Sequence, residues 1–255
     1  DEGIGPYKKA FYHRPLIRHG FAVPPSPQGE GFLGGAPPHP AQGEGFIDRG
    51  LRNLPHSTAK NKKKEGPPMH IDPTVYTGRP SDQRIPQEEA IYHKLEELSI
   101  PFTRVDHDHA DTMEDCLRIE SVLGGKICKN LFLCNRQQTE FYLLMMPGDK
   151  PFKTKYLSAQ LGCSRLSFAD AGHMEEYLHT IPGSVSALEL LFDAQGKVQL
   201  VIDRPLLADD TISGHPGIST STLRMRREDL LNYVEAVGHS PIYVDLPDPR
   251  ETGEA

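Results

Sequence analysis

The chain has 255 residues and a net charge of −7, from 28 Lys and Arg against 35 Asp and Glu. This length is enough to bury a hydrophobic core in one large domain or two small ones. No apolar run approaches the roughly 20 residues that span a bilayer, and no charged-then-apolar leader precedes a cleavage site. We therefore expect a cytoplasmic protein with no membrane partner.

Charge and composition divide the chain into two parts. Residues 1–68 hold ten Lys and Arg against six Asp and Glu, a net of +4, which leaves 18 against 29, a net of −11, for residues 69–255. The first part is rich in Gly and Pro and contains QGEGF twice. Such a segment buries too little apolar surface to offset the entropy of ordering it, which predicts disorder. One hypothesis is that residues 1–68 are translated upstream sequence absent from the native product, since Met69 opens the compact part.

A periodic pattern begins at Pro86. Ile91, Leu95 and Leu98 follow at helical spacing, which predicts an amphipathic helix ending near Ser99. The other predicted elements are a strand at Phe102–Val105, a helix from Thr112 to Gly124, strands at Asn130–Cys134 and Phe141–Met146, helices at Lys153–Leu161 and Asp170–Leu178, strands at Ala187–Phe192, Val198–Ile202 and Thr220–Met225, a helix at Glu228–Val237 and a strand at Ile242–Val244.

These elements interleave without strict alternation, which predicts an α/β or α+β fold. We expect a single compact domain with a central mixed β-sheet and surrounding helices, preceded by the disordered segment. A lead-in at 69–85 would precede the domain at 86–246, and 247–255 would form a flexible tail. The compact part lacks G-x-G-x-x-G, a Walker lysine loop and G-x-S-x-G, so dinucleotide, nucleoside triphosphate and serine-hydrolase chemistry lose their usual support.

Neither cysteines nor histidines form a metal pattern. The chain has four cysteines: Cys116, Cys128, Cys134 and Cys163. Their spacings match neither a CxxC redox pair nor a zinc ligand set, which predicts reduced, buried thiols. The segment DHDHAD, residues 106–111, could hold a metal through its histidines, but a polar loop that caps the next helix is the preferred interpretation. We expect no metal and no cofactor.

Seven collinear motifs carry a resemblance to a known family. They are CKNLFL (Cys128–Leu133), MPGDK (Met146–Lys150), SRLSFA (Ser164–Ala169), PGSVS (Pro182–Ser186), VIDRPLL (Val201–Leu207), GHP (Gly214–Pro216) and GHSPIYVDL (Gly238–Leu246). In this order the chain resembles the YbaK/ProX family of aminoacyl-tRNA deacylases, the domain associated with prolyl-tRNA synthetase. The resemblance implies a mixed central sheet and trans-editing: hydrolysis of a wrongly attached amino acid, typically alanine, from proline tRNA.

The resemblance makes Lys129 of the CKN motif the residue on which activity depends. Its ammonium could face the developing oxyanion or a terminal phosphate, whereas a lysine that protects a strand edge is the alternative. Asn130 would point to the opposite face of a regular strand, so only a bulge would aim both side chains into one site. His215 could orient water or bind the terminal adenosine, or it could be a loop histidine satisfied by the backbone.

The PGSVS loop is the second predicted part of the site. Gly183, which lacks a Cβ, would let backbone N–H groups approach the substrate, and Ser184 and Ser186 lie beside it. The chain departs from the family at Ala187, where many members have proline, and at Ser219, where Asn is common. Both departures bear on which amino acid is removed. A synthetase site built for proline rejects a smaller amino acid such as alanine by only about 1–3 kcal/mol, because the two differ by one or two methylenes. We therefore expect the specificity of editing to come from a pocket that is too small to admit proline.

The acidic charge of the compact part fits a tRNA ligand poorly, because phosphate contacts supply much of the affinity for nucleic acids. A local group of Lys150, Lys153 and Lys155 could contact the acceptor end, or these lysines could form an ordinary solvated helix face. The predicted partners are a mischarged tRNA and, through the family resemblance, prolyl-tRNA synthetase. The alternative function is a non-catalytic binding module of the same fold that recognises an aminoacyl-tRNA end or a synthetase.

Overall fold

The computed structural model describes residues 69–110 and 112–251. The predictions for residues 1–68 and for the last four residues of the tail lie outside these ranges. Within them, no helix is both long and apolar enough to cross a membrane. The helices are α1 (Pro86–Glu97), α2 (Met113–Leu123), α3 (Thr154–Leu161), α4 (Ala171–Leu178) and α5 (Arg227–Ala236), with 3-10 helices η1 (Ala187–Phe192) and η2 (Arg204–Ala208).

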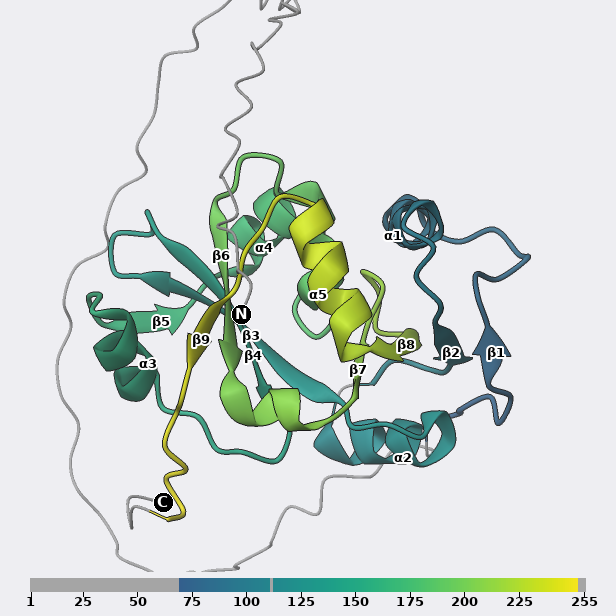
Figure 1. Cartoon of the computed structure of the whole chain (residues 1–255), viewed down its shortest axis with the longest axis horizontal. Coiled ribbons are helices and arrows are strands. Elements are labelled where there is room, and N and C mark those ends of the chain that lie inside the picture. Colours follow the sequence, from purple (N-terminus) through teal and green to yellow (C-terminus); the bar gives the residue numbers. More distant parts are fainter. Residues whose placement is uncertain (1–68, 111, 252–255) are drawn as a thin grey trace, which may run out of the picture. The chain divides into compact units, whose positions relative to one another are not determined.

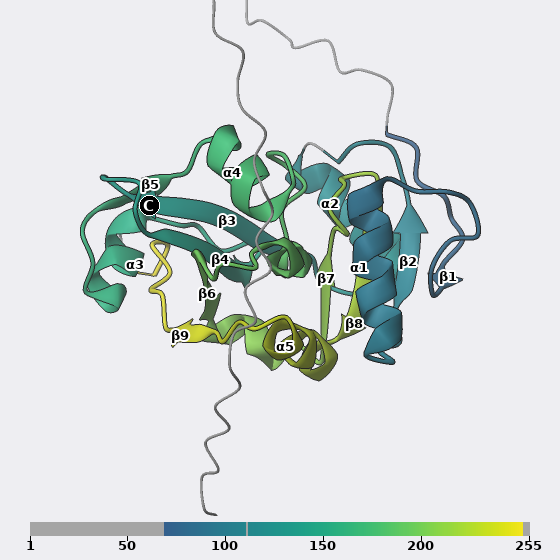
Figure 2. The same cartoon turned by 90° about the horizontal axis from the view of Figure 1, so that it is seen from above.

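Two sheets lie side by side in the described part of the chain (Figures 1 and 2). The five-stranded sheet has the order β5 (Leu166–Phe168), β3 (Cys128–Asn135), β4 (Phe141–Pro147), β6 (Val198–Asp203) and β9 (Ile242–Val244). The four-stranded sheet has the order β1 (Tyr76–Thr77), β2 (Thr103–Asp106), β8 (Ser221–Arg226) and β7 (Thr211–Gly214).

The five-stranded sheet is the predicted mixed sheet. Strand β3 pairs antiparallel with β4 and β5, whereas β4 pairs parallel with β6, and β6 with β9. The predicted β3–β4 hairpin is confirmed, and Asn135 closes its turn by accepting a hydrogen bond from the backbone N–H of Thr139 at 2.9 Å. The α/β class is therefore confirmed. The structure adds the four-stranded sheet, which is antiparallel throughout.

One predicted strand is wrong. Residues Ala187–Phe192 form the 3-10 helix η1, so β6 has no hairpin partner there and pairs with β4 instead. The physical reason is a capping box: the Ser186 hydroxyl accepts from the backbone N–H of Leu188, and the Glu189 carboxylate accepts from the backbone N–H of Ser186. This S-x-x-E pattern is a helix-start signal, and it outweighs the apolar run ALELLF that suggested a strand.

The two faces of the five-stranded sheet bury different cores. Leu133, Leu144 and Val201 face a small core covered by Leu157 of α3. Residues of β3, β4 and β6 at alternating positions face the larger core, which also receives apolar side chains from α1, α4, α5 and η1. Because side chains alternate along a strand, odd-numbered residues of β3 face α3 and even-numbered ones face the larger core.

Candidate functional site

Lys129 lines a cleft of about 680 Å³ beside the start of β3. The walls come from α2, from the turn after β4 and from η2, with the lining residues Leu117, Glu120, Lys126, Ile127, Lys129, Pro147, Gly148, Asp149, Pro151, Pro205, Leu206, Ala208 and Asp209. Elements far apart in the sequence therefore meet around one lysine. The cleft is large enough to admit an acylated ribose.

The Lys129 ammonium is half-buried and donates to a neutral acceptor. Its Nζ lies 2.9 Å from the carbonyl oxygen of Lys150, within the turn that follows β4. Burial lowers the pKa of Lys129, while Asp149 opposes the shift and Arg250 adds to it. A carbonyl holds the ammonium in place without neutralising it, so the positive charge stays available to an anion in the cleft.

A buried ion pair fixes the turn that accepts from Lys129. The Lys150 ammonium lies 2.7 Å from Asp203 and also donates to the carbonyl oxygen of Leu246 at 2.6 Å. Lys150 is 7% exposed and Asp203 is completely buried. The hypothesis that Lys150 contacts phosphate is therefore wrong, and so is its alternative of a solvated lysine, because the buried ammonium bonds to Asp203 and Leu246 in the interior.

Asn130 lies on the opposite face of β3 from Lys129. The strand pairs in regular register, with Lys129 opposite Met146 and Asn130 opposite Met145, and no bulge interrupts this stretch. The Asn130 amide oxygen accepts a hydrogen bond from the Cys128 thiol at 3.6 Å. The structure therefore does not bring the two adjacent motif residues into one site.

His215 is buried at the end of β7. Its Nδ1 lies 2.9 Å from the carbonyl oxygen of Ser221, and burial lowers its pKa to about 4. Its ring packs edge-on against that of His107 at a centroid distance of 6.0 Å. A neutral, buried imidazole bonded to backbone corresponds to the loop-histidine alternative, although its own carbonyl reaches the predicted loop by accepting from the Ser186 hydroxyl at 2.8 Å.

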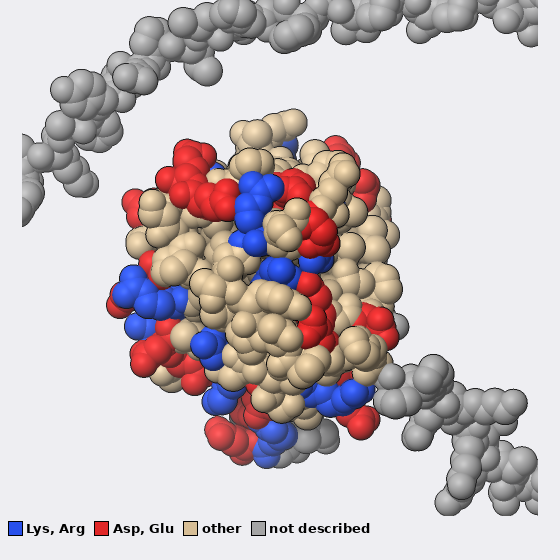
Figure 3. Space-filling view, turned by 90° about the vertical axis from the view of Figure 1, so that its right-hand side faces the viewer, with Lys and Arg blue, Asp and Glu red and all other residues tan. Residues whose placement is uncertain are grey.

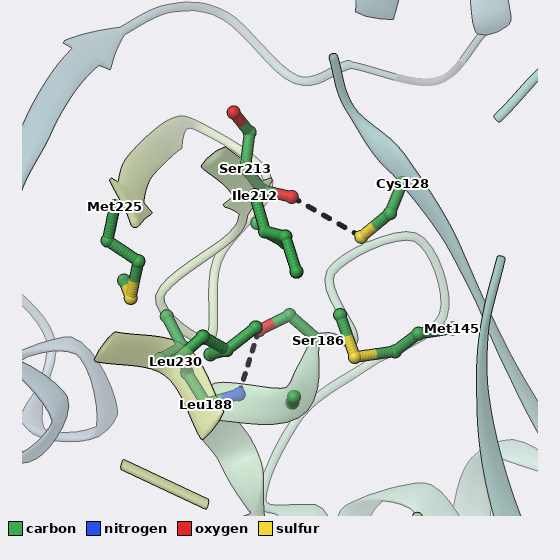
Figure 4. Close-up of a pocket in the computed structure, with 10 residues that line it drawn as sticks. Cys128, Met145, Ser186, Leu188, Ile212, Ser213, Met225 and Leu230 are labelled. Atoms are coloured by element: carbon green, nitrogen blue, oxygen red, sulfur yellow. Dashed lines mark hydrogen bonds between the residues drawn. The ribbon is translucent and has the colours of Figure 1, made fainter. Parts of the chain in front are cut away.

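The predicted loop surrounds a second, much smaller cavity of about 10 Å³ (Figure 4). Ser186 and Ala187 line it from one side, and Cys128 and Met145 line it from the sheet. Figure 4 shows the Cys128 thiol directed to the carbonyl of Ser213, a contact of 3.4 Å. This volume holds about one water molecule, so the cavity as it stands excludes an amino-acid side chain.

Gly183 and Ser184 precede the cavity-lining residues Ser186 and Ala187 in the sequence. Gly183 has a φ of +92°, a conformation that favours glycine, and a Cβ there would meet no atom within 4 Å. Ser184 is buried, and its backbone N–H donates to the carbonyl of Ile181 at 3.1 Å. The glycine is thus required by the turn itself, while the space beside it is open.

Ser219 joins the histidine segment. Its hydroxyl lies 2.7 Å from Nδ1 of His109, and Nε2 of His107 lies 2.8 Å from the Thr222 hydroxyl. Among the described residues, no group of three or more His, Cys, Asp or Glu is arranged to hold a metal ion. The segment 106–110 instead forms the end of β2 and a loop bonded to β8.

Several residues of the Lys129 cleft were not predicted from the sequence. Ile127, Leu206 and Asp209 line the Lys129 cleft, yet only Leu206 belongs to a family motif. Ile127 pairs with Ser213 of the other sheet in an isolated bridge, a contact between segments far apart in sequence. No local pattern signals such a contact.

Comparison with known proteins supplies the family. A model of the aminoacyl-tRNA editing domain matches residues 107–233. The prolyl-tRNA editing protein ProX of Acetoanaerobium sticklandii is 31% identical over 159 residues, which cover 62% of this chain and 97% of the relative. The chain belongs to the YbaK/ProX family of aminoacyl-tRNA editing domains.

A second relative and a solved structure match a similar share of this chain. The prolyl-tRNA synthetase associated domain-containing protein 1 of Danio rerio is 32% identical over 154 residues, covering 60% of this chain and 83% of that protein. The crystal structure of hypothetical protein APE2540 aligns with a TM-score of 0.50 at 18% identity, covering 61% of this chain and 97% of that one. The latter similarity concerns the fold alone.

Proposed function

We propose that this chain is a trans-editing deacylase that hydrolyses mischarged tRNA, and that its substrate is proline tRNA wrongly charged with alanine. The observation that carries the proposal is the half-buried Lys129 ammonium in the wall of the cleft, held by a carbonyl oxygen. The family and the name of the bacterial relative, prolyl-tRNA editing protein ProX, support the reaction class and the proline system.

The proposed reaction is attack of water on the ester carbonyl that joins the amino acid to the terminal ribose. A C–O bond forms to water, the carbonyl oxygen becomes an oxyanion, and collapse of this intermediate breaks the bond to the ribose oxygen, which leaves protonated as a hydroxyl. Lys129 stabilises the oxyanion in the partly desolvated cleft, where a charge is worth more than in bulk water. The ester is activated, so positioning and this one charge supply most of the required help.

Proline would be excluded by the apolar walls of the cleft. Ile127 and Leu206 are buried and line it together with Pro147 and Pro205. The proposal assigns the size limit to these residues rather than to Ala187, which lines the separate small cavity. Asn130 and His215 act in this proposal as supports of the strand and of the loop, because neither lines the Lys129 cleft.

The test is a deacylation panel across Ala-, Ser-, Cys- and Pro-tRNA with the wild type and Lys129→Ala. We expect loss of the alanyl ester, retention of the prolyl ester, and a rate reduced by about 10²–10³-fold in the variant, as for removal of an oxyanion donor. Lys197→Ala, an exposed turn lysine, is the matched control. Equal ester lifetimes with and without the wild-type protein would refute hydrolysis and leave a binding module.

A further inference from the structure

A basic groove of about 800 Å³ lies between the start of α3 and β5. Its lining comprises Phe152, Lys153, Thr154, Lys155, Ser158, Arg165 and Phe168. It includes three cationic side chains, and no Asp or Glu is among its described lining residues. In Figures 1 and 2, α3 and β5 are neighbours at the edge of the five-stranded sheet.

The lining residues of this groove directly follow those of the Lys129 cleft in the sequence. The turn after β4 lines the cleft as far as Pro151, and the groove begins at the next residue, Phe152. Lys129 and α3 also lie on the same face of the sheet, since Leu131 and Leu133 pack in the core that α3 covers. A ligand that reaches Lys129 with one end can therefore follow the same wall into the basic groove.

The groove stands out from the acidic balance of the compact part. Residues 69–255 carry a net of −11. On the face formed by α1, β1 and β2, basic and acidic side chains alternate (Figure 3), and the arginines there form ion pairs, such as Arg84 with Asp106 at 2.8 Å. A face on which both signs alternate gives a polyanion little net attraction, whereas a groove whose described lining has three cations and no carboxylate attracts one.

The groove also carries an aromatic side chain suited to stacking. Phe168, at the end of the edge strand β5, is 63% exposed, among the most exposed large apolar side chains in the described ranges. Single-stranded nucleic acids bind where cations follow the backbone and exposed aromatic rings stack on bases. The first turn of α3, which has no acidic residue, adds backbone N–H groups that favour anions.

We propose that this basic groove holds the single-stranded acceptor end of tRNA, with phosphates at Lys153 and Arg165 and a base on Phe168. The inference rests on the proposed function, because it assigns the groove to the same substrate. It predicts that the groove contributes to binding and not to the chemical step.

The test compares Lys153→Gln/Arg165→Gln with the control Arg136→Gln/Lys197→Gln, which removes two exposed cations outside the groove. Lys153 makes no side-chain cap hydrogen bond to α3, so its replacement should leave the helix intact. We expect the groove variant to bind uncharged tRNA about tenfold more weakly, and the slope of log affinity against log salt to fall by about 1 to 2. KM for Ala-tRNA should rise and kcat should stay unchanged.

Two further measurements separate the groove from the chemistry. Phe168→Ala should weaken binding of intact tRNA and leave binding of tRNA without its single-stranded end unchanged. Alanyl-adenosine, which has no phosphate to contact Lys153 and Arg165, should be hydrolysed equally by the groove variant and the wild type, but not by Lys129→Ala.

The outcomes are distinguishable. Equal tRNA affinity and equal salt slope for the groove variant and the control would overturn the groove proposal, whatever the activity. A wild type that hydrolyses no ester, together with weaker tRNA binding by the groove variant alone, would refute the proposed function and retain the groove as a tRNA-binding surface.

Discussion

The ion pair between Lys150 and Asp203 offers a sharp test of how the site is held. The two side chains lie 2.7 Å apart and share Leu246, whose carbonyl accepts from Lys150 at 2.6 Å and whose N–H donates to Asp203 at 2.9 Å. Lys150→Ala leaves a completely buried carboxylate without its cation. Breaking a buried pair in this way costs about 3–5 kcal/mol, a large part of the free energy of unfolding of a typical domain.

The size of the effect depends on which partner remains. Asp203→Ala should cost about the same as Lys150→Ala, because each single change strands one buried charge. The double variant Lys150→Ala/Asp203→Ala strands no charge, although the backbone N–H and carbonyl of Leu246 lose these partners, at about 1–3 kcal/mol each. Its total cost should therefore be several kcal/mol below the sum of the single changes.

Urea denaturation of the four proteins measures this double-mutant cycle, with Lys94→Ala, a half-buried helix lysine bonded to exposed Glu97, as the control. Single costs below about 1 kcal/mol, or additive costs, would refute the reasoning. Deacylation by Lys150→Ala, assayed under conditions where it stays folded, should also fall, because the carbonyl of Lys150 positions the Lys129 ammonium.

Three further predictions concern protonation and helix capping. Burial lowers the pKa of Lys129, so the deacylation rate should fall as Lys129 loses its proton, at a pH below the ordinary pKa of lysine. This fall should move to lower pH in Asp149→Asn and to higher pH in Arg250→Gln, because Asp149 raises the pKa and Arg250 lowers it. An unmoved pH–rate profile would contradict the assignment. Burial raises the pKa of Glu189 to about 8, so the folded state binds more protons between about pH 4.5 and 8 and the free energy of unfolding should decrease with pH across that window. Denaturation at several pH values should show this decrease in the wild type and not in Glu189→Gln. Thr112→Ala removes the cap of α2 and should cost about 1 kcal/mol in the same assay, whereas Thr112→Ser should cost little.

Local signals predicted most of the helices. Proline opens α1 at its first position, and the box of Thr112 and Asp115 opens α2, while Gly124 and Gly162 end α2 and α3 in left-handed conformations. These signals act over three or four residues, so a sequence carries them without knowledge of the fold. The strand β5 and the strand β7 were not predicted, because they are three and four residues long and TISG has little apolar pattern.

The site was predicted in part. The family motif identified Lys129, which does line a cleft, and the alternation of side chains along a strand placed Asn130 on the other face, as the regular register confirms. Lys150 was misjudged because the sequence offers no sign that Asp203, 53 residues away, is its partner. A charged residue in a turn resembles a solvated one until its distant counterion is known.

The amino-acid sequence by itself determined the fold class, the helix ends and the lysine at the centre of the proposed chemistry, because capping, periodicity and motif order are local or collinear properties. Only the tertiary structure decided that Lys150 is interior, that β6 pairs with β4 and that residues of α3 and β5 line one basic groove. Each of these depends on which segments pack together, and packing brings together residues whose separation along the chain carries no signal.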